Sequence, residues 1–146
     1  PHYLRFRKKT SPTSDLFRKM KHKFNYVQLG LWYRPIIPIT LEFNNVEFKY
    51  LALIDSGATI SIFKQEVADS LRIKIESGKE IFLGGVGGRI KGYLHKLKVE
   101  LAGQILQIPV FVSYEYLVSL NLLGRDSFFE KFRICFDEKA KKTRLE

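Results

Sequence analysis

One short segment combines an acidic side chain with neighbours that could hold it in place for proton chemistry. Asp55 directly follows the apolar run Leu51–Ile54 and is itself followed by Ser56, Gly57 and Ala58. A carboxylate at the end of a buried strand needs hydrogen-bond donors, because burial of an unpaired charge is costly. Ser56 offers a hydroxyl, and Gly57 permits a sharp turn whose backbone N–H groups can approach the carboxylate. The segment is therefore a candidate site for proton transfer, with an ordinary surface turn as the alternative interpretation.

A second segment could close over such a site. Gly84, Gly85, Val86, Gly87 and Gly88 join two predicted strands and lack the Lys-Ser/Thr ending of a phosphate-binding loop. One interpretation is a lid that hydrogen-bonds to a ligand and excludes water, and the other is a mobile turn. We expect Gly85 or Gly87 to have a positive φ or to move between states, because glycine does both at low cost.

A third segment, Leu120–Asp126, has the pattern of a buried strand that ends in a tight turn at Gly124. Other reactive side chains are isolated in the sequence. None of the three histidines has a partner at metal-ligand spacing, so we expect surface or strand positions for His2, His22 and His95. We expect Cys135 to be a buried structural thiol. The sequence therefore predicts no metal site and no cofactor.

The elements that must position these segments are mostly strands. Asn44-Asn45 is a hairpin turn signal, and Pro35 and Pro38 favour a sheet edge or a strand start. Residues 139–142 could turn the chain into a return strand at Thr143–Leu145. Runs rich in β-branched and aromatic residues predict strands at Val27–Tyr33, Ile36–Phe43, Val46–Ile54, Lys79–Leu83, Arg89–Leu101, Ile105–Val112 and Phe132–Phe136.

Helices are predicted in few places. Ile62–Ile73 carries apolar residues at helical spacing on one face. Ser127–Glu130 has the spacing of a capping box, and Asp15–Phe24 could form a short basic helix capped by Ser14. The chain is therefore predicted to be mainly β with one or two short helices.

The composition is that of a globular protein. The 146 residues fit one domain, with 45% hydrophobic and 27% charged residues. The apolar runs are too short to span a bilayer. A single cysteine excludes an internal disulfide, and no secretory signal is visible at the start of the sequence. We therefore expect an intracellular, cytoplasmic protein.

Most of the net charge lies at one end of the chain. Residues 1–24 hold eight Lys or Arg and one acidic residue, which gives +7 of the total +10. We divide the chain into a basic N-terminal arm, residues 1–26, and a folded domain, residues 27–146. Phosphate neutralisation could let the arm contact nucleic acid or an anionic membrane, and a solvated terminus is the alternative.

Taken in chain order, Ala52–Ala58, Gly84–Gly88 and Leu122–Asp126 resemble the motifs of the retropepsin family of aspartic proteases, which has retroviral, bacterial and cellular members. The resemblance covers about residues 36–136. It implies a single-lobe, closed barrel-like β fold with a flap hairpin that binds substrate. It assigns catalysis to Asp55, the supporting turn to Ser56, Gly57 and Ala58, the flap to Gly84, Gly85, Val86, Gly87 and Gly88, and the pocket and its support to Leu122, Gly124 and Arg125.

The resemblance has departures. Retroviral members carry acidic residues where Thr59 and Ile60 stand, so Arg125 could lack its usual intersubunit partner. The predicted helix is longer than the viral loop, and the chain extends past both ends of the family pattern. The dimer sheet that viral members build from both termini is therefore not assured here.

Proteases of this type need two carboxylates that share a proton, and the chain contains one Asp-Ser-Gly. We therefore expect a homodimer in which each chain supplies one Asp55, acting as an endopeptidase on peptide or protein substrates. Two alternatives stay open. One is a catalytically silent dimerisation or peptide-binding module of the same fold, and the other is a nucleic-acid binder that uses the basic arm.

Overall fold

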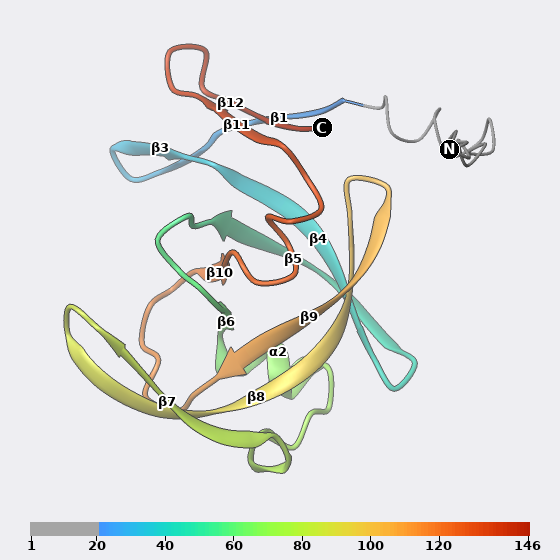
Figure 1. Cartoon of the computed structure of the whole chain (residues 1–146), viewed down its shortest axis with the longest axis vertical. Helices are drawn as coiled ribbons and strands as arrows, with labels where there is room; N and C mark the ends of the chain where they lie inside the picture. Colours follow the sequence, from blue (N-terminus) through green and yellow to red (C-terminus); the bar gives the residue numbers. More distant parts are fainter. Residues whose placement is uncertain (1–20) are drawn as a thin grey trace, which may run out of the picture.

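The computed structural model describes residues 21–146, and this part of the chain is mainly β. Six strands pair in the order β4-β5-β10-β6-β9-β8, and β4 also pairs with β8, so the sheet closes on itself (Figure 1). The predicted closed, barrel-like β fold is therefore confirmed. The strands of this ring are β4 (Ile36–Phe43), β5 (Val46–Ile54), β6 (Ser61–Phe63), β8 (Gly88–Leu101), β9 (Gln104–Val112) and β10 (Asn121–Leu123).

The β4–β5 hairpin forms as its sequence predicts. Asn44 and Asn45 have φ values of 47° and 64°, the left-handed conformation that asparagine tolerates and that tight hairpin turns require. Pro38 lies on β4 opposite Leu51, before the pairing of β4 with β8 begins at Thr40. Its missing N–H therefore faces an edge, and no ladder hydrogen bond is lost.

The predicted helix at Ile62–Ile73 is wrong in its extent. Residues Ser61–Phe63 form β6, which pairs in parallel with β9, and α2 spans only Gln65–Ser70. Arg72 has φ 57°, so the helix cannot continue through it. The apolar spacing was real, because Phe63, Val67 and Ala68 are all buried in the core. A short 3₁₀ turn, η1 (Ile75–Ser77), leads into the next strand.

No helix forms at Ser127–Glu130, where the chain makes turns instead. Ser127 has φ 61°, which is incompatible with the extended conformation of a helix N-cap. Its hydroxyl donates to the Asp126 carboxylate at 2.7 Å and is therefore not used to cap the following N–H groups. The turns still bury Phe128 and Phe132 against the core.

The glycine cluster is the tip of a two-stranded hairpin, as predicted. Strand β7 (Lys79–Gly85) pairs with the first half of β8 so that Gly85 lies opposite Gly88, with Val86-Gly87 at the tip. Of the two properties expected for Gly85 or Gly87, a positive φ is not found, and movement between states stays a prediction. Gly88, with φ 110°, holds the left-handed conformation, whereas Gly85 and Gly87 lie outside it.

A separate three-stranded sheet joins the two ends of the described chain. The order is β1-β12-β11, with β12 in the centre and antiparallel to both neighbours. The predicted return strand is therefore confirmed. Its members are β1 (His22–Asn25), β11 (Ile134–Asp137) and β12 (Lys142–Leu145).

The start of the described chain is extended and belongs to this sheet. The predicted basic helix is wrong for its last residues, because His22–Phe24 pair with β12, and its earlier part lies outside the described residues. Tyr26 is buried, and its N–H donates to Lys141 at 2.7 Å. The division of the chain at residues 26 and 27 stays a prediction, with residues 22–26 held against the C-terminal hairpin.

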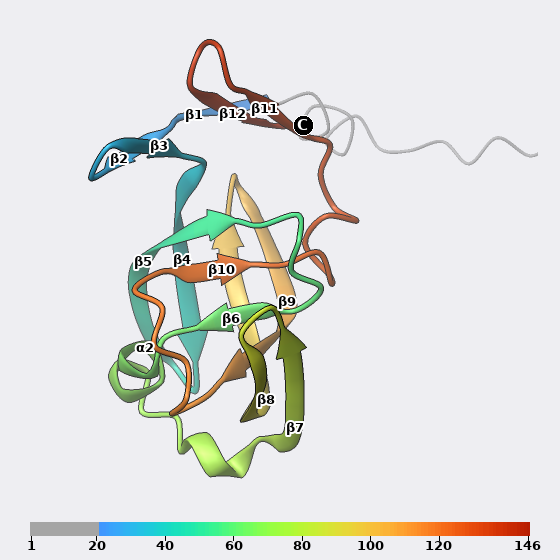
Figure 2. The ribbon, with the colours of Figure 1, turned by 90° about the vertical axis from the view of Figure 1, so that its left-hand side faces the viewer.

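The run Val27–Tyr33 was predicted as one strand but folds as a small hairpin. Its strands are β2 (Val27–Leu29) and β3 (Trp32–Arg34), which pair only with each other. Gly30, with φ 60°, allows the reversal between them. In Figure 1 this hairpin and the β7–β8 tip extend to the same side of the molecule, and Figure 2, seen from that side, shows the hairpin above the tip.

Close packing at Gly124 gives a stability prediction. A Cβ at this position would lie 2.5 Å from the carbonyl carbon of Ile60, which is backbone and cannot move aside cheaply. We expect Gly124→Ala to lower the free energy of unfolding by about 1–3 kcal/mol, measured by urea denaturation. The control is Gly87→Ala, since a Cβ there meets nothing within 4 Å. Equal denaturation midpoints for the two variants would contradict the close packing.

Candidate active site

Asp55 stands where β5 leaves the ring. Its backbone N–H donates to Leu123 at 3.0 Å, which extends the parallel pairing of β5 with β10 by one residue. The preceding residue, Ile54, is buried, while Asp55 itself is half-buried. The apolar strand therefore fixes the backbone of Asp55, and the side chain emerges at the boundary between core and solvent.

The turn after Asp55 supplies a donor to the carboxylate. The Gly57 N–H donates to Asp55 Oδ1 at 2.9 Å, and the Ala58 N–H donates to the Asp55 carbonyl at 3.3 Å. A Cβ on Gly57 would lie 3.2 Å from the same Oδ1, so glycine leaves the carboxylate room. Ser56 is exposed at the outer corner of the turn. The carboxylate is therefore held by one backbone donor, as predicted for Gly57, whereas the hydroxyl that Ser56 was expected to offer makes no hydrogen bond to it within the described residues.

A second loop, residues 124–127 after β10, braces this turn through the backbone and is called the Gly124 loop below. The N–H of Arg125 donates to Ala58 at 2.9 Å, and the N–H of Asp126 donates to Thr59 at 2.8 Å. The Gly124 N–H donates to the buried Ser61 hydroxyl at 3.0 Å. The Arg125 side chain is exposed and forms no ion pair with residues 21–146, so the contact seen at this position is made by its main chain.

Asp55 opens onto a cleft of about 480 Å³. Sheet register explains its apolar wall, because Leu122 lies directly beside Leu53 on one neighbouring strand and beside Ile62 on the other. Gly84 from the flap completes the opposite side. The lining consists of Asp55, Gly57, Ala58, Thr59, Ile60, Ile62, Leu83, Gly84 and Leu122.

The cleft brings together some of the residues predicted for the site and leaves others at its margin. Five of them line it, and Gly124 is buried behind it. Val86 at the flap tip is fully exposed and lies outside the cleft. Gly85, Gly87 and Gly88 are also exposed and lie outside the cleft. The predicted residues outside the lining are Ser56, Gly85, Val86, Gly87, Gly88, Gly124 and Arg125.

Several cleft residues were not singled out from the sequence. Ile62 was assigned to a helix, because the sequence Ser61-Ile62-Phe63 has no apolar/polar alternation, and the alternating burial of a strand appears only in the structure. Leu83 is the last apolar residue before the glycine cluster, and its position there was the available signal. Thr59 and Ile60 were noted only because they are not acidic.

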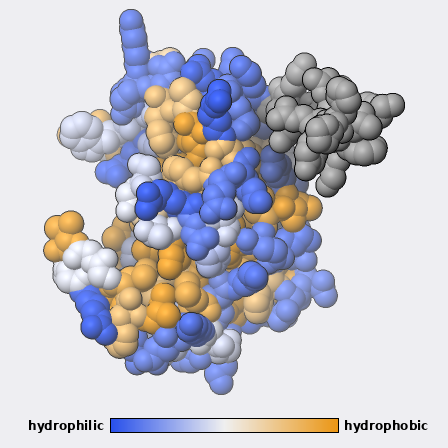
Figure 3. All heavy atoms as spheres, in the orientation of Figure 1, coloured by the Kyte–Doolittle hydropathy of each residue, from blue (hydrophilic) through white to orange (hydrophobic). Residues whose placement is uncertain are grey.

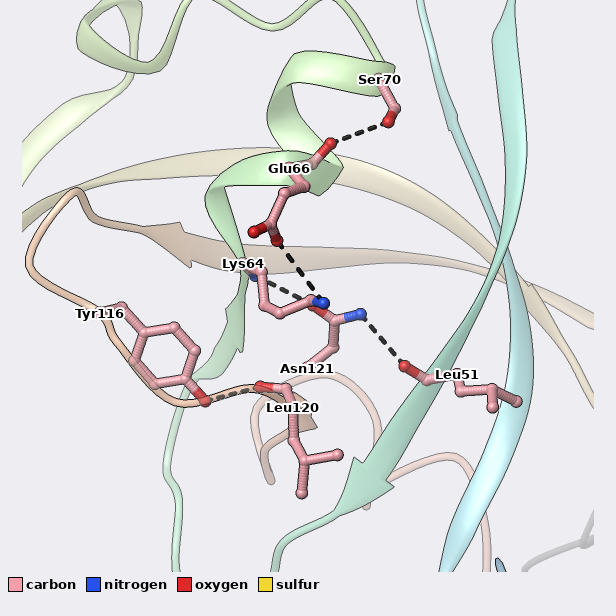
Figure 4. A network of polar contacts seen from close by, with 7 residues as sticks. All are labelled: Leu51, Lys64, Glu66, Ser70, Tyr116, Leu120 and Asn121. Atoms are coloured by element: carbon pink, nitrogen blue, oxygen red, sulfur yellow. Dashed lines mark hydrogen bonds and ion pairs between the residues drawn. The ribbon is translucent and has the colours of Figure 1, made fainter. Parts of the chain in front are cut away.

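Tyr116 is a further residue of this region that the sequence did not indicate. Its hydroxyl donates to the Leu120 carbonyl at 2.7 Å and ties the ends of a short loop together (Figure 4). Burial raises the pKa of Tyr116 to about 12, and the negative charge of Asp55 adds to the rise. The phenol therefore stays protonated and remains a hydrogen-bond donor throughout the neutral range.

Asn121 fixes the start of the strand that carries Leu122. Its side-chain oxygen accepts from the Lys64 N–H at 2.9 Å, and its side-chain nitrogen donates to the Leu51 carbonyl at 3.1 Å (Figure 4). One buried amide thus connects β5, β10 and the segment that opens α2. The floor of the cleft is therefore tied at both ends of β10, by Asn121 and by the Gly124 loop.

Other reactive side chains stand apart from the cleft. His95 lies in β8, as expected for a strand residue, with Nε2 2.9 Å from the Ile75 carbonyl, and His22 lies in β1. His2 is outside the described residues. Cys135 is half-buried, not fully buried as predicted, and its sulfur accepts from Arg144 at 3.0 Å.

The described part of the chain lacks two kinds of feature. Residues 21–146 contain no cluster of three His, Cys, Asp or Glu side chains that could hold a metal ion. Within the same residues, no helix has the length and apolar character needed to cross a membrane.

Comparison with known proteins bears on these motifs directly. No curated protein sequence is significantly similar to the chain. Among solved structures, EIAV protease complexed with the inhibitor HBY-793 is similar, with 22% sequence identity and a TM-score of 0.49. That similarity covers 68% of this chain and 88% of the EIAV protease chain. The sequence profile of the family described as aspartyl protease matches residues 39–127, which include Asp55, the flap and Gly124. The match extends over more than half of the chain, and the protein therefore belongs to the aspartyl protease family.

Proposed function

We propose that the protein is an aspartic endopeptidase whose catalytic pair consists of two Asp55 carboxylates, one from each chain of a homodimer. The observation that carries the proposal is the placement of Asp55 at the mouth of an apolar cleft, with its turn braced by the Gly124 loop. The membership of the aspartyl protease family supports the same chemistry. Since the sequence contains one Asp-Ser-Gly, the second carboxylate comes from a second copy.

The chemistry uses two carboxylates and one water molecule. One ionised Asp55 accepts a proton from the water, which attacks the peptide carbonyl carbon, while the protonated Asp55 donates to the carbonyl oxygen and a tetrahedral diol forms. The first carboxyl then donates its new proton to the amide nitrogen and the other takes a proton back from a diol hydroxyl, so the C–N bond breaks and an acid and an amine leave. Two carboxylates in contact cannot both ionise readily, so the pair holds one proton and titrates as a unit. The Gly57 N–H, 2.9 Å from Oδ1, orients each carboxylate. The proposed role of Ser56, Gly57 and Ala58 is to hold this orientation.

The flap and the cleft wall indicate which class of substrate the proposed enzyme binds. Leu83 and Gly84 line the same cleft as Asp55, and the hairpin continues beyond them to Val86 (Figure 2). An extended peptide could pair with the exposed flap backbone while its side chains enter the apolar cleft at Leu122. The glycines from Gly84 to Gly88 leave that backbone accessible, and Gly124 with Arg125 support the floor. The substrate class is therefore an extended peptide segment with apolar side chains at the cleaved bond.

The first prediction removes the ionisable group. Asp55→Asn keeps the size of the side chain, so we expect an unchanged thermal unfolding midpoint and loss of nearly all cleavage of a peptide library. Asp126→Asn is the matched control, because Asp126 lies in the adjacent loop and bonds to Ser127. Full activity in Asp55→Asn would contradict the proposed catalytic role. A wild-type chain without activity, at any concentration, would favour the silent peptide-binding module.

The second prediction concerns the shared pair. Addition of excess Asp55→Asn chains to the wild type should abolish activity, because mixed dimers contain a single ionisable carboxylate. Specific activity should also fall on dilution, and the pH profile should show two apparent pKa values that belong to the pair. Sedimentation analysis at the assay concentrations is the accompanying measurement. A strictly monomeric wild-type chain that cleaves peptide at full rate would refute the dimer mechanism.

The third prediction tests the flap through its one left-handed glycine. Gly88 has φ 110° and open space around it, so Gly88→Val is strained by conformation and not by collision. A strain of about 1–3 kcal/mol would reduce the population of the present turn by about 5- to 150-fold. We expect kcat/KM to fall within that range while global unfolding changes little. Gly103→Val is the control, since Gly103 also has a positive φ, 71°, but lies in the turn between β8 and β9 and does not line the cleft. Equal kcat/KM values for the two variants would argue against a flap role for this turn.

A further inference from the structure

We propose that the β2–β3 hairpin is a contact surface for a second copy of this chain and extends the dimer interface beyond the two Asp55 residues. The inference rests on the proposed homodimer and names a part of its interface. The hairpin spans residues 27–34 and makes no strand pairing with the ring or with the terminal sheet. An isolated two-stranded hairpin is marginally stable in water, so this one needs a surface to pack on.

The hairpin exposes large apolar side chains that a free surface hairpin would not need. Leu31 at the turn is 89% exposed, Trp32 is 69% exposed and Tyr33 is 49% exposed. Leu29, directly opposite Trp32 in the register, is 39% exposed. Leu29 and Trp32 share one face of the hairpin, Leu31 stands at its tip and Tyr33 lies on the other face, because successive strand residues alternate. Exposed apolar clusters such as the one formed by Leu29, Leu31 and Trp32 mark interaction sites.

The base of the hairpin lies directly beside the catalytic strand. The Pro35 carbonyl, one residue past β3, accepts the Ile54 N–H at 3.0 Å, and Ile54 precedes Asp55. In Figure 1 the hairpin and the flap tip both project to the left of the ring. Figure 3 shows the corresponding outline, with two projections that flank a hollow on the left. A two-fold axis that pairs two Asp55 carboxylates brings a second copy onto this side.

Arg34 adds a polar feature at the same place. Its Nε is enclosed, and no acceptor for it is present among residues 21–146. An enclosed donor of a charged guanidinium is costly without an acceptor. Arg34 is the last residue of β3 and pairs with Val27 at the hairpin base. Because the chain's own atoms already enclose this Nε, a second copy could supply an acceptor only after the Arg34 side chain turns outward from the hairpin base.

Trp32 makes the inference directly measurable, because it is the single tryptophan of the chain. We expect its fluorescence emission in the full-length protein to be blue-shifted and protected from acrylamide at high protein concentration. On dilution, emission should shift to the red over the same concentration range in which sedimentation analysis shows dissociation. The substitution Asp55→Asn should leave this transition in place, since the transition reports contact and not chemistry.

A charge in the patch should weaken the dimer. We expect Leu31→Glu to raise the dimer dissociation constant by about tenfold or more, because a carboxylate would replace a buried leucine. Ile105→Glu is the matched control: Ile105 is 63% exposed and lies near the turn between β8 and β9, away from the flap tip. The two variants carry the same added charge, so a difference between them reports position alone.

The possible outcomes separate this inference from the proposed function. A Trp32 emission that does not change while the dimer dissociates would overturn the hairpin contact and leave the Asp55 mechanism standing. A blue-shifted emission independent of concentration would mean that another part of the same chain covers the hairpin, which also overturns the contact. Cleavage by Asp55→Asn would refute the proposed function, and the concentration dependence of Trp32 would still decide the contact. Equal dissociation constants for Leu31→Glu and Ile105→Glu would overturn it as well.

Discussion

The rest of the site depends on the close approach between the Gly124 loop and the turn that follows Asp55, residues 56–60. Gly124 packs against the backbone of Ile60 with no room for a side chain. This contact lets Arg125 and Asp126 donate from their main chain to Ala58 and Thr59. Backbone hydrogen bonds between two loops fix a carboxylate more firmly than side-chain contacts do, because fewer rotatable bonds intervene. The position of Asp55 is therefore set by the ring and not by its own side-chain partners.

The closed ring explains why a small domain can hold such a loop pair. β10 is only three residues long, yet it pairs with β5 on one side and with β6 on the other. Asn121 at its start and Gly124 at its end each bond across to a neighbouring segment. The same three strands direct Leu53, Leu122 and Ile62 outward into one row. The pairing of β5, β10 and β6 therefore determines both the apolar wall of the cleft and the backbone position of Asp55.

The sequence was informative where structure is decided locally. Local sequence alone determines three features: the Asn44-Asn45 turn, the glycine hairpin and the turn after Asp55. Turn-forming residues decide the first two, and an apolar strand followed by a glycine turn decides the third. The sequence was uninformative where pairing between strands far apart in the chain determines the structure. Ser61–Phe63 fits a helical pattern, but parallel pairing of Ile62 with Phe111 makes it a strand. Likewise the pairing of Gly85 with Gly88 places the positive φ on Gly88, which glycine content alone could not indicate.

The tips of the β2–β3 and β7–β8 hairpins carry apolar side chains that the single chain does not cover. The ring buries its core residues well, as the full burial of Ile37, Phe63 and Leu123 indicates. On the side of Asp55, by contrast, Val86 and Leu31 project with almost all of their surface exposed. The chain supplies one Asp-Ser-Gly carboxylate where the proposed chemistry needs two, and it leaves apolar side chains uncovered at two hairpin tips on the same side. One symmetric partner would satisfy both needs, because a two-fold axis at Asp55 brings a second carboxylate and a second apolar surface to the same face.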